Sequence, residues 1–339
     1  MSVIGVLTAG GDCPGLNAVI RGVVARALES GDHEVVGIRN GWEGLMEEDL
    51  VPLDRDAVRG ILAKGGTILG TSRKDPYVHG GGSEGVRRTV TANGIDTLVV
   101  IGGDGTLRTG LRLQEEGLSV VGVPKTIDND IAATDFTFGF DTAVQIATEA
   151  IDRLTTTAEA HNRVILCEVM GRTKGWIAVY AGLAAGADAI LIPEIPMSLE
   201  EVASIIRKRH RRGRKYSIVV VAEGVEPPER VELARDAFGF ERLGGVAYQI
   251  APRLEDLTGF ETRVTVLGHL QRGGSPTAFD RVLATRLGAA AADLALAGES
   301  SVMVAMKGPD IVAVSLADAC AEIRGVDEQL YRTAKTFFG

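Results

Sequence analysis

The chain has 339 residues, of which 45% are hydrophobic and 24% are charged, and its formal net charge is -9. This length accommodates two α/β domains with buried sheets. The acidic balance argues against general nucleic-acid binding, so an anionic ligand would need local clusters of cations. Three widely spaced cysteines fit neither a disulfide framework nor a zinc site, and the apolar runs are shorter than a membrane span. The composition predicts a cytoplasmic protein without nucleic-acid or membrane partners.

The chain opens with a β-loop-α pattern. Residues 3–8 form an apolar run typical of a buried strand, and the glycine-rich turn 10–15 and an amphipathic helical pattern follow. The glycine spacing matches neither the dinucleotide-binding fingerprint nor the P-loop. A second glycine-rich segment, 65–74, ends in Arg73 and Lys74. Such a pair alone is typical of a solvated loop.

The first of two central loops is Gly102-Gly103-Asp104-Gly105-Thr106, which ends the apolar run 98–101 and precedes a helical pattern. Glycines let a ligand approach the backbone, and the amides of a helix N-terminus favour anions. An unshielded carboxylate would repel a phosphate, so an aspartate beside phosphates indicates Mg²⁺. Asp104 is therefore the predicted metal ligand, although an aspartate at this place also serves as a helix cap.

The second central loop, PKTIDND at 124–130, follows the apolar run 118–123. It carries two carboxylates, a hydroxyl and an ammonium at the expected carboxyl end of a parallel strand, where open α/β sheets bind ligands. If the neighbouring loop holds a nucleotide, one of these aspartates can accept the proton of an attacking hydroxyl. Asp and Asn are also ordinary turn residues.

The second half repeats the alternation of strands and helices. Buried strands are predicted at 164–169, 189–192 and 218–221, and an alanine-rich helix at 277–298. The basic block 207–215 has no interleaved aromatic side chains, so it is typical of a solvated helix end rather than of a nucleic-acid site.

GGDGT followed by PKTIDND resembles the 6-phosphofructokinases, and matching segments continue from residue 3 to about residue 298. These include TAGGDCPGLNAVIRG in the first half and EVMGR and GHLQRGGSP in the second. The resemblance implies an α/β fold with two Rossmann-like three-layer αβα lobes and mainly parallel sheets. It implies a nucleotide-binding lobe from 1–139 plus about 271–318, and a sugar-phosphate-binding lobe from about 140–270 plus 319–339.

The resemblance further implies a glycolytic kinase that transfers the ATP γ-phosphoryl group to O1 of fructose 6-phosphate, with Mg²⁺ as cofactor. Asp128 would be the general base and Asp104 the metal ligand. Positions that match the family's ATP site are Gly11, Arg73, Lys74, Gly103, Asp104, Gly105 and Thr106. Positions that match its substrate site are Thr126, Ile127, Asp128, Asp130, Arg163, Met170, Gly171, Arg172, Glu223, Arg263, His269 and Arg272.

Some of these residues also have simpler interpretations. Without their context, Met170 and His269 would suit a core, and Glu223 would suit an ordinary surface. The family's arginines at the positions of Arg163 and Arg263 reach the neighbouring subunit, so the resemblance implies a homodimer or homotetramer.

The phosphoryl donor depends on Gly105 and Lys125. Pyrophosphate-dependent relatives commonly carry aspartate and lysine at these two positions, and many ATP-dependent relatives carry glycine at both, so this chain is mixed. An aspartate at position 105 would crowd and repel the ATP α-phosphate, whereas glycine leaves space, which favours ATP over pyrophosphate. More remote alternatives are an NAD-kinase-like or lipid-kinase-like enzyme, which shares GGDGT, and a non-catalytic regulatory subunit that binds sugar phosphate.

Allosteric regulation is a further possibility that the resemblance raises. Positions that match the family's effector site are Arg21, Arg55, Asp188, Arg212 and Arg214. Two other effector-site arginines are replaced by Ala25 and Thr155, so the chain departs from the family's effector-site pattern.

Overall fold

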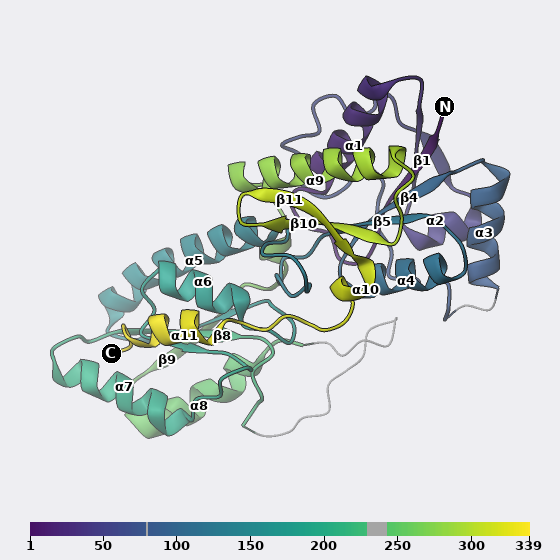
Figure 1. Ribbon diagram of the computed structural model, residues 1–339. Helices are drawn as coiled ribbons and strands as arrows, with labels where there is room; N and C mark the ends of the chain where they lie inside the picture. The colour runs from purple at the N-terminus through teal and green to yellow at the C-terminus, as the bar shows by residue number, and fades with distance from the viewer. Residues whose placement is uncertain (79–80, 229–242) are drawn as a thin grey trace. The chain divides into compact units, whose positions relative to one another are not determined.

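The structure is a computed structural model that describes residues 1–78, 81–228 and 243–339. Strands and helices alternate along most of the chain, and the sheets are mainly parallel (Figure 1). The expected α/β class is confirmed. Within the described ranges, no helix has the length and apolar character needed to cross a membrane.

The chain forms two compact units, each made of two segments. Unit 1 comprises Met1–Thr142 and Arg272–Ile323. Unit 2 comprises Ala143–Gln271 and Arg324–Gly339. The ligand that each lobe would bind stays a prediction.

Unit 1 contains a seven-stranded sheet in the order β11-β10-β5-β4-β1-β2-β3. Its strands are β1 (Val3–Thr8), β2 (Glu34–Ile38), β3 (Leu50–Pro52), β4 (Thr97–Gly102), β5 (Val120–Pro124), β10 (Val302–Lys307) and β11 (Asp310–Ser315). Only the two edge strands, β3 and β11, run antiparallel to their neighbours among these strands. The central strands are buried on both faces, which is why they read as continuous apolar runs.

Helices cover both faces of this sheet (Figure 1). One face carries α1 (Leu16–Ser30) and α9 (Ala278–Leu296), which pack against each other. The other carries α2 (Trp42–Glu47), α3 (Gly82–Ala92), α4 (Asp104–Glu115) and α10 (Leu316–Ala319). A Cβ atom at Gly22 of α1 would lie 2.7 Å from the carbonyl oxygen of Thr285 in α9, and one at Gly288 would collide with the carbonyl of Val19. The two helices therefore meet backbone to backbone.

Unit 2 contains a four-stranded parallel sheet in the order β7-β8-β6-β9. Its strands are β6 (Val164–Val169), β7 (Ala189–Leu191), β8 (Ser217–Ala222) and β9 (Thr262–Val266). One face packs on α7 (Leu199–Arg211) and α8 (Val246–Thr258), and the other on α6 (Trp176–Ala184) and α11 (Glu328–Lys335). The long helix α5 (Phe140–His161) begins in unit 1, and a short 3₁₀ helix, Gly268–Arg272, follows β9.

Candidate active site

Three loops of unit 1 follow the carboxyl ends of the neighbouring parallel strands β1, β4 and β5. β4 pairs in parallel with both β1 and β5, with Ile101 opposite Thr8 and Gly102 opposite Pro124. The amide of Lys125 donates to the carbonyl of Gly102 at 3.0 Å, which joins the starts of two loops. Parallel neighbours end on the same side, so the structure brings the GGDGT and PKTIDND loops together.

The GGDGT loop leads directly into α4. Gly103 is the extended N-cap, and Asp104 is the first helical residue. A Cβ atom at Gly102 would collide with the buried Thr106, whereas one at Gly105 would meet no atom within 4 Å. The glycine at 102 thus allows close packing, and the glycine at 105 leaves open space beside a helix N-terminus that favours anions.

Asp104 fits a magnesium ion that arrives with phosphates. Its Oδ1 accepts a hydrogen bond from Nε of Arg108 at 2.8 Å, and its side chain is 19% exposed. The described part of the chain holds no cluster of three or more His, Cys, Asp and Glu side chains suited to a metal. Mg²⁺ is commonly held by one or two carboxylates and completed by substrate phosphates and water. A single carboxylate at this loop matches that donor set.

Hydrogen bonds within the PKTIDND loop fix the surroundings of Asp128, which is buried. Its amide donates to Oγ1 of Thr126 at 3.0 Å, and the carbonyl of Thr126 accepts the hydroxyl of Thr137 at 2.8 Å. Asn129 adopts a left-handed conformation, with φ 50°, and its Oδ1 accepts the amide of Thr137 at 3.0 Å. The loop therefore presents Asp128 on a constrained backbone.

Two cations reach the first loop, 10–15, from other segments. The ammonium of Lys125 donates to the carbonyl of Gly11, and the guanidinium of Arg272 donates to the carbonyl of Asp12 at 3.1 Å. Lys125 is 4% exposed, and burial lowers the pKa of its ammonium. Within unit 1, the structure thus places Arg272 beside the predicted nucleotide loop.

The segment 65–74 also contacts the first loop. The amide of Gly10 donates to the carbonyl of Ser72 at 3.0 Å, and the hydroxyl of Thr71 donates to the carbonyl of Gly10 at 2.6 Å. The ammonium of Lys74 pairs with the carboxylate of Glu43 in α2, and this hydrogen bond raises the pKa of Lys74. The predicted donor-binding residues of unit 1 therefore belong to one connected set of loops.

In unit 2, the predicted sugar-binding turn after β6 is supported by Glu223 at the end of β8. Gly171 and Arg172 have positive φ values of 143° and 54°, and Met170 is buried. Oε1 of Glu223 accepts the amides of Gly171 at 3.3 Å and Arg172 at 2.8 Å. Glu223 therefore stabilises the backbone of this turn, a role that the sequence did not reveal.

Arg163 and Arg263 of unit 2 converge on one carboxylate. Nε of Arg163 lies 2.8 Å from Oε2 of Glu261, and Arg263 pairs with Oε1 of the same residue. The hydrogen bond from Arg163 lowers the pKa of Glu261. His269 is exposed, so the alternative of a core histidine is wrong.

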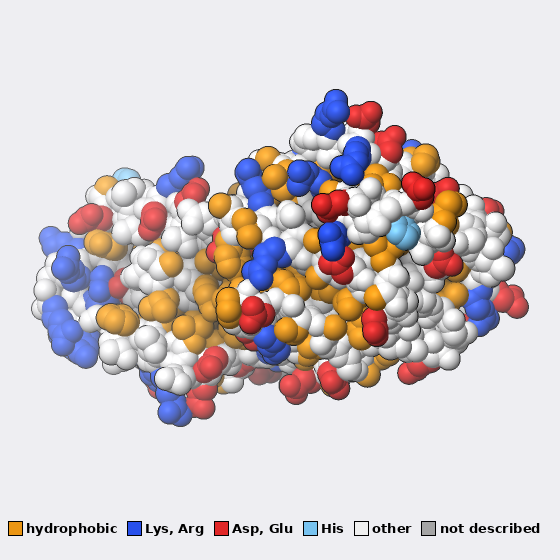
Figure 2. All heavy atoms as spheres, turned by 45° about the horizontal axis from the view of Figure 1, so that its top comes forward, with side chains coloured by type: hydrophobic (Ala, Val, Ile, Leu, Met, Phe, Trp, Pro, Cys, Tyr) orange, Lys and Arg blue, Asp and Glu red, His pale blue; other side chains and the backbone are white. Residues whose placement is uncertain are grey.

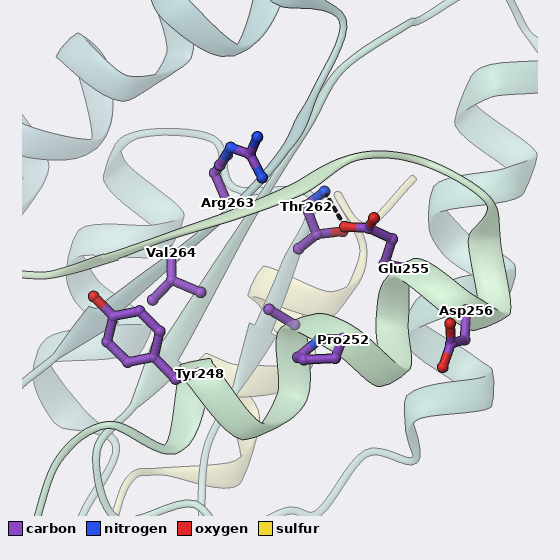
Figure 3. Close-up of a pocket in the computed structure, with 8 residues that line it drawn as sticks. Tyr248, Pro252, Glu255, Asp256, Thr262, Arg263 and Val264 are labelled. Carbon is purple, nitrogen blue, oxygen red and sulfur yellow. Dashed lines mark hydrogen bonds between the residues drawn. The ribbon is translucent and has the colours of Figure 1, made fainter.

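A cavity of about 460 Å³ lies between α8 and β9 (Figure 3). Figure 3 shows Tyr248 and Val264 pointing toward each other, whereas Arg263 points to the other side of the strand. Two of the residues that line the cavity are joined directly, because the amide of Thr262 donates to Oε2 of Glu255 at 2.9 Å. This cavity contains no residue of the PKTIDND or GGDGT loops and belongs to unit 2 alone.

The basic block 207–215 covers the last turn of α7 and the residues that follow it. Figure 2 shows Lys and Arg side chains gathered on the surface of unit 2, at the left of the view. Arg209 lies 2.8 Å from the buried Asp188, and Arg212 donates to the carbonyl of Gly339 at 3.1 Å. Cations in the last turn suit the negative end of the helix dipole. Asp188, matched to the family's effector site, is thus paired within unit 2.

The predicted site residues fall in both units. Unit 1 holds Gly11, Arg73, Lys74, Gly103, Asp104, Gly105, Thr106, Lys125, Thr126, Ile127, Asp128, Asp130 and Arg272. Unit 2 holds Arg163, Met170, Gly171, Arg172, Glu223, Arg263 and His269. Sequence analysis missed Arg108, although its spacing of four residues from Asp104 on a predicted helix was a usable signal.

Comparison with known proteins agrees with this architecture. A family profile described as "Phosphofructokinase" matches residues 3–295. The chain is 54% identical to the pyrophosphate–fructose 6-phosphate 1-phosphotransferase of Amycolatopsis methanolica, with 99% of each chain covered. It is 53% identical to an ATP-dependent 6-phosphofructokinase of Mycobacterium tuberculosis, again with 99% of each covered.

Among solved structures, the T-state phosphofructokinase of Pichia pastoris has a TM-score of 0.85 and 35% identity, over 99% of this chain and 38% of that one. The pyrophosphate-dependent phosphofructokinase of Marinobacter aquaeolei has a TM-score of 0.83 over 100% of this chain and 92% of that one, and at 24% identity it shows the fold alone. The predicted phosphofructokinase fold is confirmed. The chain belongs to the phosphofructokinase family.

Proposed function

We propose that the protein transfers the γ-phosphoryl group of ATP to O1 of D-fructose 6-phosphate, which yields fructose 1,6-bisphosphate and ADP in glycolysis. The observation that carries the proposal is the pairing of Gly102 with Pro124, which sets the loops of Asp104 and Asp128 side by side. Relatives of both donor types act on fructose 6-phosphate according to their names, which supports this acceptor.

The loops of unit 1 supply the chemistry. Asp128 would accept the O1 proton as O1 forms its bond to the γ-phosphorus and ADP leaves. Thr126 and Asp130 would help to position the sugar and the metal. Asp104 would hold Mg²⁺, which supplies positive charge against the phosphate oxygens when it is bound. The presence of both aspartates opposes a non-catalytic role.

The remaining predicted residues would bind the two substrates. The amides of Gly11 and of Gly103–Thr106, with Arg73 and Lys74, would hold the nucleotide. The sugar phosphate would be held by Ile127, Arg163, Met170, Gly171, Arg172, Glu223, Arg263, His269 and Arg272. Arg163 and Arg263 would act across a subunit interface, in a homodimer or homotetramer. Three free, buried cysteines support a reducing compartment and thus a cytoplasmic location.

Different observations favour the two candidate phosphoryl donors. Open space beside Gly105 supports ATP, because an aspartate there would crowd and repel the α-phosphate. The relative from Mycobacterium tuberculosis, which is named as ATP-dependent, also supports ATP. Pyrophosphate is the second candidate donor, because the relative from Amycolatopsis methanolica is named for it and pyrophosphate-dependent relatives commonly carry lysine at position 125. Lys125 excludes neither donor, since an ammonium can contact both. An aspartate side chain at position 105 would discriminate between the donors more strongly than Lys125 does. This chain has glycine there, and we therefore favour ATP.

Turnover of fructose 6-phosphate should be measured with ATP and with pyrophosphate in parallel, at equal Mg²⁺. We expect kcat/KM to be higher with ATP. A higher value with pyrophosphate would reverse the donor assignment and leave the acceptor intact. Absence of fructose 1,6-bisphosphate with both donors would overturn the proposed reaction.

A further inference from the structure

Three consecutive carbonyl groups of the first loop are each bound by a donor from a different segment. The carbonyl of Gly10 accepts the hydroxyl of Thr71 at 2.6 Å. That of Gly11 accepts the ammonium of Lys125, and that of Asp12 accepts the guanidinium of Arg272 at 3.1 Å. Hydrogen bonds therefore hold the backbone of the loop at three successive peptide groups.

The hydrogen bonds to these carbonyl groups also fix the orientation of the amides that follow them. In a trans peptide the N–H of the next residue points away from the carbonyl, so each donor sets the direction of the amide that follows. The amides concerned belong to Gly11, Asp12 and Cys13. Successive backbone N–H groups held in this way form concave sites for anions.

This loop lies beside the N-terminus of α4. A Cβ atom at Gly10 would lie 3.4 Å from Oγ1 of Thr106 and 3.7 Å from Nζ of Lys125. At Gly11 it would lie 2.7 Å from a guanidinium nitrogen of Arg272, so the loop has little room to shift. The oriented amides and the helix N-terminus are thus next to each other, where donor phosphates would bind.

We propose that Lys125 is a positioning residue, which holds the first loop for the phosphates of either donor and does not select between ATP and pyrophosphate. The inference rests on the proposed function, because it takes the phosphates of a donor as the ligand. Lys125 is 4% exposed, and its ammonium is already engaged by the Gly11 carbonyl. Both donors present phosphates to the same amides, so loosening the loop should weaken both alike. Discrimination would then fall to Gly105.

The test replaces Lys125 with Met, which has a side chain of similar length but carries no ammonium. The dissociation constants of Mg·ATP and Mg·pyrophosphate should be measured by calorimetry without sugar phosphate. We expect both constants to rise by roughly tenfold or more, as for a lost hydrogen bond to a charged group. Their ratio should stay within about threefold of the parent value. Lys125→Arg should recover part of the loss, because a cation is restored.

The matched control is Gly105→Asp, which should shift the ratio toward pyrophosphate. A change in the ratio beyond about threefold in Lys125→Met, or unchanged constants for both donors, would overturn the positioning role. These constants are independent of turnover, so a parent that binds donors but makes no product contradicts the proposed reaction and leaves this inference testable.

Hydrogen exchange gives a second measurement on the parent and on any variant that folds. In the parent, Mg·ATP or Mg·pyrophosphate should slow exchange in the segment 9–15. In Lys125→Met without ligand, the same segment should exchange faster, while α9 should be unchanged. Lack of protection in the parent, or exchange that is equal in parent and variant, would count against the proposal.

Discussion

Arg108 and Asp104 lie one helical turn apart on α4 and form an ion pair, with 2.8 Å between Nε and Oδ1. A guanidinium therefore occupies one oxygen of the carboxylate that would hold Mg²⁺. Because both cations would share one carboxylate, we expect their mutual repulsion to weaken binding of the metal.

Replacing Arg108 with Ala should lower the Mg²⁺ concentration needed for half-maximal activity by about two- to fivefold, the scale of a partly exposed ion pair. A Mg²⁺ titration at saturating substrates measures this, with direct binding of Mn²⁺ as a second readout. Arg112→Ala is the matched control, since Arg112 is on the same helix and lies over the ring of Tyr77. A higher Mg²⁺ requirement in Arg108→Ala would show that Arg108 assists the metal instead.

Asp128→Ser should lose at least about two decades of kcat, the lower range for removal of a general base. Binding of ATP should be nearly unchanged, because the carboxylate acts on the acceptor hydroxyl. Steady-state kinetics and calorimetry with ATP separate the two effects. Nearly full activity would refute Asp128 as the base.

Gly105→Asp should reduce kcat/KM for ATP by roughly tenfold or more and affect pyrophosphate much less. The reason is local, since the new carboxylate would enter open space beside the α4 N-terminus and repel the α-phosphate. Kinetics with both donors measure the change. Gly105→Ala is the matched control, because it adds a Cβ atom in the same open space without a charge. Equal losses for the two donors would contradict selection at position 105.

Glu223→Gln should raise KM for fructose 6-phosphate by roughly tenfold, because a neutral oxygen holds the amides of Gly171 and Arg172 less strongly than a carboxylate. KM for the donor should change less. A matched control is Glu226→Gln, a few residues further along the chain. If donor and sugar KM rise equally, the role of Glu223 is a general structural one.

Asp280 should make stability depend on pH. Burial raises its pKa from 3.8 to about 6, although Oδ2 accepts both the amide of Thr142 at 2.8 Å and its hydroxyl at 2.5 Å. The unfolded chain gives up this proton near pH 4 and the folded chain near pH 6. The stability that Asp280 contributes is thus fully present below about pH 4 and is lost as pH rises to about 6.

Relative to the parent, Asp280→Asn should therefore gain stability as pH rises through this window, by on the order of 3 kcal/mol. Urea unfolding at several pH values measures the difference between the two proteins. Asp293→Asn on the same helix is the control, because Asp293 is half exposed and pairs with Arg26 at the surface. A constant difference between parent and Asp280→Asn would contradict the assignment.

The central strands were predictable from sequence. The structure places β1 at Val3–Thr8 and β6 at Val164–Val169, the residues of the predicted apolar runs. Strands buried on both faces carry this signal in every residue. β11 was missed because Asp310–Ser315 is an edge strand with mostly half-exposed or exposed side chains. β3 was missed because three residues have no readable period.

The site was predictable as a set of residue types, but not as a set of contacts. The two central loops are continuous in sequence, and the roles proposed for them rest on glycines and carboxylates next to strand ends. Arg272 meets the carbonyl of Asp12 across 260 residues, and Lys74 meets Glu43 on a helix that the sequence did not predict. Such partners depend on tertiary packing, which leaves no local pattern.

The meeting of Gly22 with Gly288 also bears on biosynthesis. α1 is synthesised early. The helix α9, which covers it, and the strands β10 and β11 are synthesised only after the main segment of unit 2. Domains generally fold as units during synthesis, and unit 1 is complete only once Arg272–Ile323 has been made. The amino-terminal part of unit 1 therefore stays without its closing segment for most of synthesis. Truncation at Thr142 should accordingly yield an aggregation-prone fragment, whereas a fragment that folds cooperatively would show that the closing segment is dispensable.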